Sequence, residues 1–356
     1  MTSIAESKSP ALDSTTKDPN NLPLLYHQTS QYRHWRFSYA QLLSIREASN
    51  AGAVERVKSN YEQEMAESQD TSYSKDEVKF LTVEEELALC IFYETRLQTM
   101  CKMVKLPDTV MYTAVMYMKR FFLHNTVMDY HPKDVLYTCL FLATKAENER
   151  LSIDEFCQRL RVPSSDSVLN LEFTVSQGLK FEYCIYHPYR AAYGFFLDLQ
   201  TVMTEMKPLK ALYSKVQALI AKLVLTDVPF VYQPSQIAIT CFMVADDDPD
   251  IQKAINNYID LRFMDQKPML MKIKEDVDST LKNFKPVSTE DAKTIDRSLR
   301  FCANPANNPE SSIYKKRKAE REKADEEKRS KKLKEREMSR ESLNDVVTAE
   351  DSASEK

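Results

Sequence analysis

Hydrophobic residues recur at helical spacing through most of the chain between about residues 38 and 285. From 108 to 124, for example, apolar side chains stand at the i, i+3, i+4 and i+7 positions of an amphipathic helix. Ser38, Thr82 and Ser152 each stand three residues before a Gln or Glu, which predicts capping boxes that begin helices. The pattern predicts a leading helix from Ser38 to about residue 60, a linker over 61–79, and five helices at about 82–103, 108–124, 132–147, from 152, and 166–180.

The helix predicted at 132–147 differs from the others because it has no polar face. Pro132 suits the first helical turn, where its missing N–H costs nothing, and almost every side chain from Val135 to Ala143 is apolar. A helix that is apolar on all sides is buried by its neighbours, so we expect it at the centre of a domain. It nevertheless ends in Lys145 and Glu147, two charges at the edge of the core.

Glu172 interrupts the apolar stripe of the helix predicted at 166–180. At about 100° per residue, its direction lies among those of stripe residues such as Val168 and Val175. A carboxylate there is costly unless it is paired or hydrogen-bonded, and Lys145 is the expected neighbour. Such a pair is either an ion pair at a domain rim, which contributes only ~0 to 1 kcal/mol, or a fixed pair of charges that binds a partner.

The chain overlays itself without a gap when it is shifted by 102 residues. The aligned segments 119–143 and 221–245 share these identical pairs: Tyr130 and Tyr232, Pro132 and Pro234, Thr138 and Thr240, Cys139 and Cys241, Ala143 and Ala245. The charges do not repeat, because Lys145 faces Asp247 and Glu172 faces Lys274. We therefore expect two tandem five-helix domains, of which only the first carries the charge pair.

Composition favours an all-α fold. The 356 residues suffice for two ordinary domains, but the 3 glycines are too few for glycine-rich phosphate loops or for the turns of a sheet-rich fold. The 7 scattered cysteines form no C-x-x-C pair and indicate reduced thiols. No run of about 18 apolar residues occurs, so we expect a soluble, non-secreted protein without a membrane segment.

Charge is concentrated near the C-terminus. The whole chain holds 49 Lys/Arg and 53 Asp/Glu. Residues 315–340 contain 13 basic and 7 acidic residues, and residues 341–356 contain 1 basic and 5 acidic residues. Residues 1–310 therefore hold 35 basic against 41 acidic residues. The acidic body makes direct nucleic-acid binding unexpected. Residues 315–340 are expected to form a solvated helix or disorder, and their basic clusters Lys315–Lys318 and Lys328–Lys332 are also of the nuclear-import type.

The sequence offers no catalytic constellation. The 5 histidines are well separated, and neither a G-x-S-x-G elbow nor the signature set of a protein kinase occurs. His124 with Asp129 or His131 can be imagined as an acid–base pair, but a helix end followed by a loop explains these residues better. We therefore expect no enzyme, no cofactor and no metal.

Several motifs together resemble a known family. A buried third helix that ends in Phe-Leu-Ala-Thr-Lys-Ala-Glu at 141–147, followed by a fifth helix with a matching acid, resembles the cyclin box. Five further motifs resemble the cyclin H family: Arg33-His-Trp35, Met116-Tyr-Met-Lys-Arg120, Asn125-Thr-Val-Met-Asp-Tyr-His-Pro132, Leu179-Lys-Phe181 and Pro188-Tyr-Arg190. That family supplies the regulatory subunit of the kinase that activates other cyclin-dependent kinases and belongs to transcription factor II H.

The resemblance, which covers about residues 30 to 285, implies an all-α fold of two tandem five-helix cyclin-box repeats with flanking N- and C-terminal helices. It implies that Lys145 and Glu172 hold the regulatory helix of a cyclin-dependent kinase in its active position. It places further residues on the same kinase-facing surface: Leu142, Glu147, Phe173, Phe181 and Tyr183. The implied partners are the kinase catalytic subunit, a third assembly subunit and transcription factor II H, and the implied location is the nucleus. The implied role is to support phosphorylation of kinase activation loops and of the C-terminal domain of RNA polymerase II.

We accordingly divide the chain into a disordered lead-in (1–30), an N-terminal helix and linker (31–79), a first cyclin box (80–187), a second cyclin box (188–285) and a charged C-terminal helix or tail (286–356). Trp35 is the only tryptophan, and it either staples the incoming chain onto the core or faces a partner. Ser9-Pro10 is a weak candidate for proline-directed phosphorylation.

Two departures from the family pattern and two alternatives stay open. Asn148 stands where the family has a second acid, and the helix at 82–103 lacks the M-R-x-x-L of cell-cycle cyclins, so no substrate-docking patch is expected. One alternative is another transcriptional cyclin, of the C type. The other is a nucleic-acid-binding twin-repeat factor resembling transcription factor II B, which would have a zinc ribbon and basic repeats.

Overall fold

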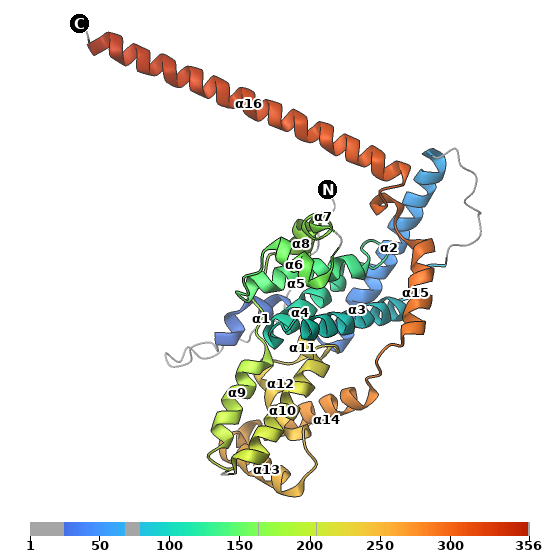
Figure 1. The fold of residues 1–356 in the computed structure, drawn as a ribbon, viewed down its shortest axis with the longest axis vertical. Coiled ribbons are helices and arrows are strands. Elements are labelled where there is room, and N and C mark those ends of the chain that lie inside the picture. The colour runs from blue at the N-terminus through green and yellow to red at the C-terminus, as the bar shows by residue number, and fades with distance from the viewer. Residues whose placement is uncertain (1–24, 68–78, 163, 204, 355–356) are drawn as a thin grey trace, which may run out of the picture.

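The computed structural model describes residues 25–67, 79–162, 164–203 and 205–354, and in this part of the chain the regular elements are all helical (Figure 1). The N-terminal segment holds η1 (Leu25–Gln28), α1 (Ser30–His34) and α2 (Tyr39–Glu67). Six helices follow: α3 (Val83–Met103), α4 (Asp108–His124), α5 (Pro132–Ala146), α6 (Ile153–Leu160), α7 (Ser165–Leu169) and α8 (Glu172–Gly178). The all-α prediction is confirmed, whereas Ser9-Pro10 lies outside the described residues.

The second half of the chain repeats this arrangement and ends in a long helix. It comprises α9 (Pro188–Leu199), α10 (Met206–Leu223), α11 (Val228–Val231), α12 (Pro234–Val244), α13 (Pro249–Arg262), η2 (Met264–Gln266) and α14 (Lys267–Asn283). The C-terminal segment holds α15 (Thr289–Cys302), η3 (Pro305–Asn307) and α16 (Ser312–Ser354). Figure 1 shows α3–α8 and α9–α14 as two adjoining bundles, with α16 extending away from both.

Helix α5 is a central helix of the first bundle, as its sequence predicts. Pro132 occupies the first helical turn, and ten of the 15 residues of α5 are buried. Helix α4 shares the centre, because thirteen of its 17 residues are buried, including Lys119 and Arg120. The corresponding helix of the second bundle is α12, which Pro234 also begins and whose residues Ile237 to Met243 are all buried. The internal repeat is therefore structural.

The helix predicted at 166–180 is wrong in one respect, because it consists of α7 and α8. In a continuous helix the carbonyl of Val168 accepts a hydrogen bond from the backbone N–H of Glu172. Here the hydroxyl of Thr138 on α5 donates to that carbonyl, over 3.0 Å. The chain turns at Asn170 before α8 begins, while Val168 and Val175 stay buried as the stripe predicted.

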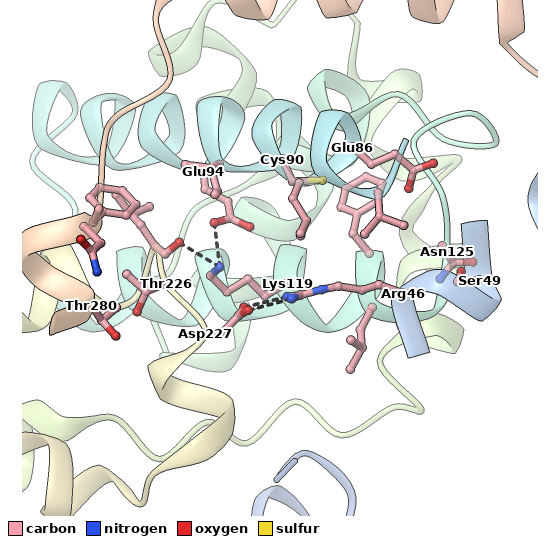
Figure 2. Close-up of a pocket in the computed structure, with 18 of the residues that line it drawn as sticks. Arg46, Ser49, Glu86, Cys90, Glu94, Lys119, Asn125, Thr226, Asp227 and Thr280 are labelled. Atoms are coloured by element: carbon pink, nitrogen blue, oxygen red, sulfur yellow. Dashed lines mark hydrogen bonds and ion pairs between the residues drawn. The ribbon is translucent and has the colours of Figure 1, made fainter. Parts of the chain in front are cut away.

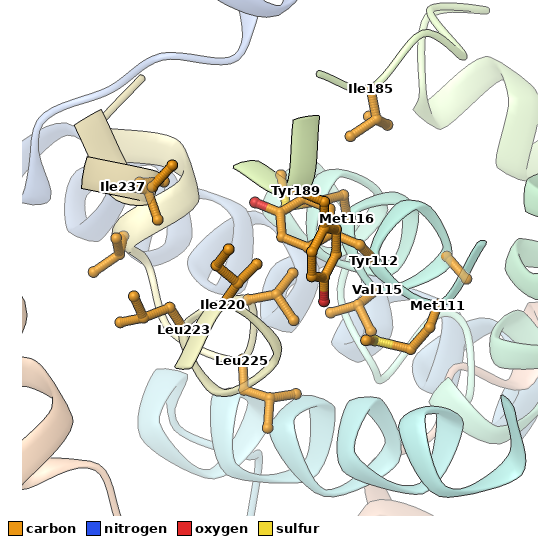
Figure 3. Packing of buried hydrophobic residues seen from close by; sticks show 14 of the residues in the cluster. Met111, Tyr112, Val115, Met116, Ile185, Tyr189, Ile220, Leu223, Leu225 and Ile237 are labelled. Carbon is orange, nitrogen blue, oxygen red and sulfur yellow. The ribbon is translucent and has the colours of Figure 1, made fainter. Parts of the chain in front are cut away.

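The two bundles share one hydrophobic core rather than meeting through a polar seam. Val115 and Met116 of α4 belong to the same buried cluster as Ile220 and Leu223 of α10, and all four side chains are at most 1% exposed. Ile220 extends toward Val115 (Figure 3). Burying apolar area of this kind stabilises a fold by roughly 25 cal/mol per Å². The first bundle is therefore held in a fixed orientation on the second.

Charged side chains lie beside this core and line a pocket of 370 Å³ (Figure 2). Arg46 of α2 donates two hydrogen bonds of 2.7 Å to Asp227, which follows α10. Lys119 lies 3.1 Å from Glu94 and donates to the carbonyl of Leu225 over 3.2 Å, and the side chains of Lys119 and Glu94 are 6% and 3% exposed. These contacts connect α2, α3 and α4 with the second bundle.

Arg46→Gln is expected to reduce the free energy of unfolding at pH 7 by about 1.5 to 3 kcal/mol, because hydrogen bonds to a charged partner are lost. Burial alone raises the pKa of Asp227, but the hydrogen bonds from Arg46 and the charge of Lys119 outweigh it and lower that pKa below its ordinary value. This stabilisation is present above the ordinary carboxyl pKa of about 3.9 and is lost as the pH falls through the lowered value.

Urea unfolding between pH 3 and pH 7 checks this prediction, since Arg46→Gln should flatten the acid limb of the stability profile. The control is Arg159→Gln, which breaks an exposed ion pair with Glu155 on one helix face and should cost about 0.5 kcal/mol or less. If stability fell equally with decreasing pH in wild type and Arg46→Gln, the Arg46–Asp227 pair would not be the source of this pH dependence.

The lead-in of the chain packs on the first bundle. The side chain of Trp35 is 1% exposed, its indole N–H donates to Glu182 over 2.6 Å, and the guanidinium of Arg120 lies 4.7 Å from its ring centroid. Trp35 therefore anchors the N-terminal segment to the core and does not face a partner. The disordered lead-in predicted for 1–30 is wrong from Leu25 onwards, because η1 and the Thr29 N-cap of α1 are ordered by local hydrogen bonds.

The C-terminal segment packs against α2 and α3. Leu299 and Cys302 of α15 are buried beside Leu89 of α3, and α2 continues to Glu67 rather than ending near residue 60. The carboxylate of Glu64 accepts hydrogen bonds of 2.8 and 2.9 Å from the first N–H groups of α16. Residues 300–312 are thus a packed connection. The later part of α16 is exposed through residue 332, as expected for a solvated helix.

Candidate partner-binding surface

The charge pair predicted from the sequence forms at one end of α5. Lys145, in the last turn of α5, donates a hydrogen bond to Glu172, the first residue of α8. Both charges suit their positions, since a helix C-terminus favours a cation and an N-terminus an anion. The ammonium of Lys145 also lies 4.5 Å from the ring centroid of Phe141. The pair is thus fixed between two helices of the first bundle, α5 and α8.

The pair is exposed in the free chain. The side chains of Lys145 and Glu172 are 43% and 32% exposed, so solvent screens their attraction and the pair contributes only ~0 to 1 kcal/mol to stability. Its carboxylate and ammonium groups stay accessible to a second molecule. This geometry suits recognition better than structural support.

Two exposed aromatic rings lie beside the pair. Phe173 follows Glu172 on α8 and is 69% exposed, and Phe181 is 54% exposed. Their ring centroids are 6.0 Å apart in an edge-to-face arrangement. Phe181 and Lys180 have φ angles of 58° and 55°, the left-handed region that non-glycine residues adopt rarely. The backbone turns there to present Phe181 to solvent.

The other predicted residues are less accessible. Leu142 is 5% exposed within the core, so in the free chain it supports the surface from below. Glu147 accepts a hydrogen bond of 2.7 Å from the hydroxyl of Thr113 and lies 3.3 Å from the imidazole of His187. Tyr183 is half-buried, and its ring meets that of Tyr117 edge to face. The structure brings these residues to one end of the first bundle but exposes them unequally.

Glu147 is held ionised by its surroundings. Burial raises the pKa of this carboxyl, but the hydrogen bonds from His187 and Thr113 outweigh burial and lower the pKa below its usual value. Because His187 immediately precedes α9, Glu147 ties the end of α5 to the start of the second bundle. Its side chain therefore orients the surface even where it is not itself exposed.

Sequence reasoning missed the residues that support the loop carrying Phe181 and Tyr183. The hydroxyl of Tyr117 donates to the carbonyl of Tyr183 over 2.5 Å, and Arg120 donates to the carbonyl of Glu182 over 3.1 Å. Both donors belong to the motif at 116–120. The available signal was the buried position of Arg120 on an apolar helix, since a buried cation needs partners.

The described residues do not bring the sequence's candidate catalytic side chains together. His131 lies 2.8 Å from Asp296 and Asp129 binds Arg56, so the acid–base pair imagined for His124 does not form. No group of three His, Cys, Asp or Glu side chains among the described residues could hold a metal ion. Over the same residues, no helix combines the length and apolar character needed to cross a membrane.

Two family models match this chain. The model described as "Cyclin, N-terminal domain" matches residues 55–184, and the "Cyclin C-terminal domain" model matches residues 187–289. The chain is 33% identical over 272 residues to Cyclin CCL1 of Saccharomyces cerevisiae. The aligned region spans 72% of this chain and 67% of the yeast protein. It is 31% identical over 300 residues to Cyclin mcs2 of Schizosaccharomyces pombe, and this alignment spans 83% of this chain and 91% of that protein.

Two solved complexes contain chains of similar fold. A chain of the CAK complex from Chaetomium thermophilum bound to ATP-gamma-S superposes with a TM-score of 0.71 at 27% identity, covering 84% of this chain and 94% of that one. A chain of the yeast TFIIK (Kin28/Ccl1/Tfb3) complex superposes with a TM-score of 0.58 at 31% identity, covering 71% and 99%.

Proposed function

The chain belongs to the cyclin family, and on that premise we propose that it is the regulatory subunit of a CDK-activating kinase, of the kind that belongs to transcription factor II H. It binds a cyclin-dependent kinase in the nucleus and performs no chemistry of its own. Its partner phosphorylates the activation loops of other cyclin-dependent kinases and the C-terminal domain of RNA polymerase II.

The observation that carries the proposal is the accessible Lys145–Glu172 pair beside two exposed phenylalanine rings. A fixed pair of opposite charges with an apolar flank fits a helix that presents both polar and apolar groups. The similar cyclins named above, and the similarity to chains of the CAK and TFIIK complexes, support the same partner class. The yeast TFIIK complex comprises Kin28, Ccl1 and Tfb3, which also fits a third assembly subunit.

The mechanism follows from what a kinase requires for activity. An active protein kinase forms an ion pair between a strand lysine and a glutamate on its regulatory helix. Lys145 and Glu172 bind that helix in its inward position, and Phe173 and Phe181 cover its apolar side. Because the cyclin binds the active arrangement better than the inactive one, it shifts the kinase population towards activity.

Co-purification tests the proposal directly. A tagged full-length chain is expected to isolate one cyclin-dependent kinase and one further subunit, and the isolate should phosphorylate a kinase activation loop. The purified chain alone should show no phosphotransfer. Isolation with a C-type partner kinase would favour the C-type cyclin, and binding of residues 1–310 to duplex DNA at moderate salt would favour the twin-repeat transcription factor.

A further inference from the structure

A second pocket, of 330 Å³, lies at the opposite end of α5 from the candidate partner-binding surface. Its walls come from α2, the loop before α5, η3 and the first turns of α16. Helix α5 has 15 residues, so this pocket and Lys145 are separated by roughly 20 Å along the helix. The kinase-facing residues therefore do not explain it.

The pocket is strongly cationic. Four of its residues are basic, namely Arg56, Arg317, Lys318 and Arg321, against the single carboxylate of Asp129. Asp129 is already engaged by Arg56 over 2.5 Å and by the amide of Asn304 over 2.7 Å, and its side chain is 10% exposed. Three positive charges therefore remain without a carboxylate from the pocket wall.

The remaining cations have weak or neutral partners. The guanidinium of Arg317 donates to the side-chain oxygens of Asn60 and Gln63 over 2.9 and 3.1 Å, which hold it in place without neutralising it. Lys318 lies 4.0 Å from Glu322, with both side chains more than 60% exposed, so solvent screens that attraction. Arg321 is exposed, and although burial raises the pKa of Tyr130, Arg321 is close enough to reduce that rise.

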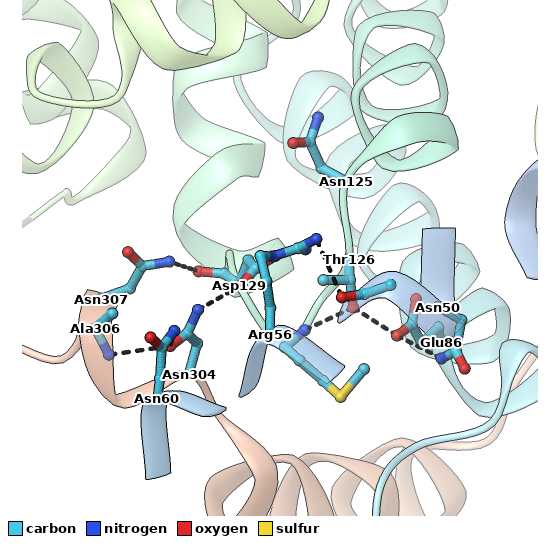
Figure 4. Close-up of polar contacts among 12 residues, drawn as sticks. Asn50, Arg56, Asn60, Glu86, Asn125, Thr126, Asp129, Asn304, Ala306 and Asn307 are labelled. Atoms are coloured by element: carbon cyan, nitrogen blue, oxygen red, sulfur yellow. Dashed lines mark hydrogen bonds and ion pairs between the residues drawn. The ribbon is translucent and has the colours of Figure 1, made fainter. Parts of the chain in front are cut away.

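The wall opposite α16 is a connected framework of amides. Asn60 donates to the side chain of Asn304 over 2.9 Å, and Asn307 donates to the carbonyl of Asp129 over 2.8 Å (Figure 4). These bonds hold α2, η3 and the loop before α5 together. The cationic side chains are thus presented by a preformed site rather than by a free helix.

We propose that this pocket binds the phosphate of a phosphorylated serine or threonine side chain on another protein. A phosphomonoester carries nearly two negative charges and accepts several hydrogen bonds, and arginine binds such groups with a planar pair of donors. The exposed rim formed by Lys318 and Arg321 lets a phosphate enter while it stays attached to its polypeptide. The tyrosine rings of Tyr130 and Tyr314 supply apolar wall for the flanking residues.

Nucleic acid is a poorer match for the same charges. A duplex requires many phosphate contacts along its length, whereas this pocket gathers four basic residues at one point of a chain that holds 49 Lys/Arg against 53 Asp/Glu in total. A compact cluster of three cations without a carboxylate partner in the pocket wall fits one dianionic group. The phosphorylated side chain is therefore the occupant that the geometry favours.

Isothermal calorimetry of the full-length chain tests the proposal with a capped Ala-Ala-phosphoserine-Ala-Ala peptide. The phosphopeptide is expected to bind at the stoichiometry of one site, and its serine counterpart is not. Arg321→Gln should weaken binding about tenfold, because one charged hydrogen bond of ~1.4 kcal/mol is lost. Arg329→Gln removes the same charge from the same helix eight residues away and should change binding less than about twofold.

Arg321 is exposed, so its replacement should not disturb folding, and circular dichroism verifies this. Unchanged affinity in Arg321→Gln, or an equal loss in Arg329→Gln, would overturn the proposal. Tighter binding of inorganic phosphate than of the phosphopeptide would assign the pocket to the free anion instead. Displacement of the phosphopeptide by stoichiometric duplex DNA at 150 mM salt would assign it to nucleic acid, and either result rejects the protein-borne phosphate.

Discussion

Lys145→Ala or Glu172→Ala is expected to weaken binding of the partner kinase by roughly 2 to 5 kcal/mol, a loss of about thirtyfold or more. In the free chain the pair is 43% and 32% exposed, so each substitution should change the free energy of unfolding by about 1 kcal/mol or less. In the proposed complex the kinase would desolvate both charges, and removing one would leave the other without its counter-charge. Calorimetry with the purified kinase and urea unfolding of the free cyclin measure the two quantities separately.

The second bundle provides matched controls. Asp247 and Lys274 occupy the positions of Lys145 and Glu172 after the shift of 102 residues, and their replacement by alanine should leave kinase binding nearly unchanged. The double variant of Lys145 and Glu172 should lose less kinase-binding free energy than the sum of the two single variants, because each single variant leaves the remaining charge without its partner. Equal losses at both sets of positions would reject a binding surface restricted to the first bundle.

The central helices were predictable because their sequence constrains them locally. Pro132 marks the start of α5, its apolar residues fill every face, and a second copy begins at Pro234. The pairing of Lys145 with Glu172 was predicted from the cost of an unpaired carboxylate in an apolar stripe, although the side chain of Glu172 is 32% exposed in the structure. These features depend on helix geometry and burial, both of which can be inferred from residues that are close together in the sequence.

The C-terminal packing was not predictable for a physical reason. Leu299 and Cys302 form a short apolar face on α15, and the face is buried only because α3, some 200 residues earlier, lies opposite. The extension of α2 depends on polar side chains, Asn60 and Glu64, whose partners are Asn304 and the first turn of α16. Polar residues that are buried through distant partners look like exposed residues in a sequence.

The support of the partner-binding surface shows the same limit. Phe181 could be assigned to the surface only through the resemblance to the family, since no periodicity places it there. Its position depends on Tyr117 and Arg120, whose hydrogen bonds hold the carbonyls of Tyr183 and Glu182. The loop is shaped by α4 and by the lead-in, which converge on Glu182 from two distant parts of the chain.

Trp35→Ala is expected to reduce the free energy of unfolding by roughly 3 to 5 kcal/mol, as for other fully buried aromatic residues. The substitution empties the site between Arg120 and Lys180, which lie 4.7 and 5.3 Å from the indole ring centroid. It also removes the hydrogen bond of 2.6 Å to Glu182, whose carboxylate then loses one of its donors. Urea unfolding of the free chain measures the loss.

Trp35→Phe separates packing from hydrogen bonding, because the ring is retained while the donor is lost. It should cost about 1 to 3 kcal/mol, the penalty for an unsatisfied acceptor. Leu43→Ala, at a side chain that is 50% exposed, is the control and should cost less than about 1 kcal/mol. Since Glu182 adjoins Phe181, both Trp35 variants should also weaken kinase binding, and in the order of their stability losses. A loss of kinase binding with unchanged stability would contradict the structural role assigned to the buried Trp35.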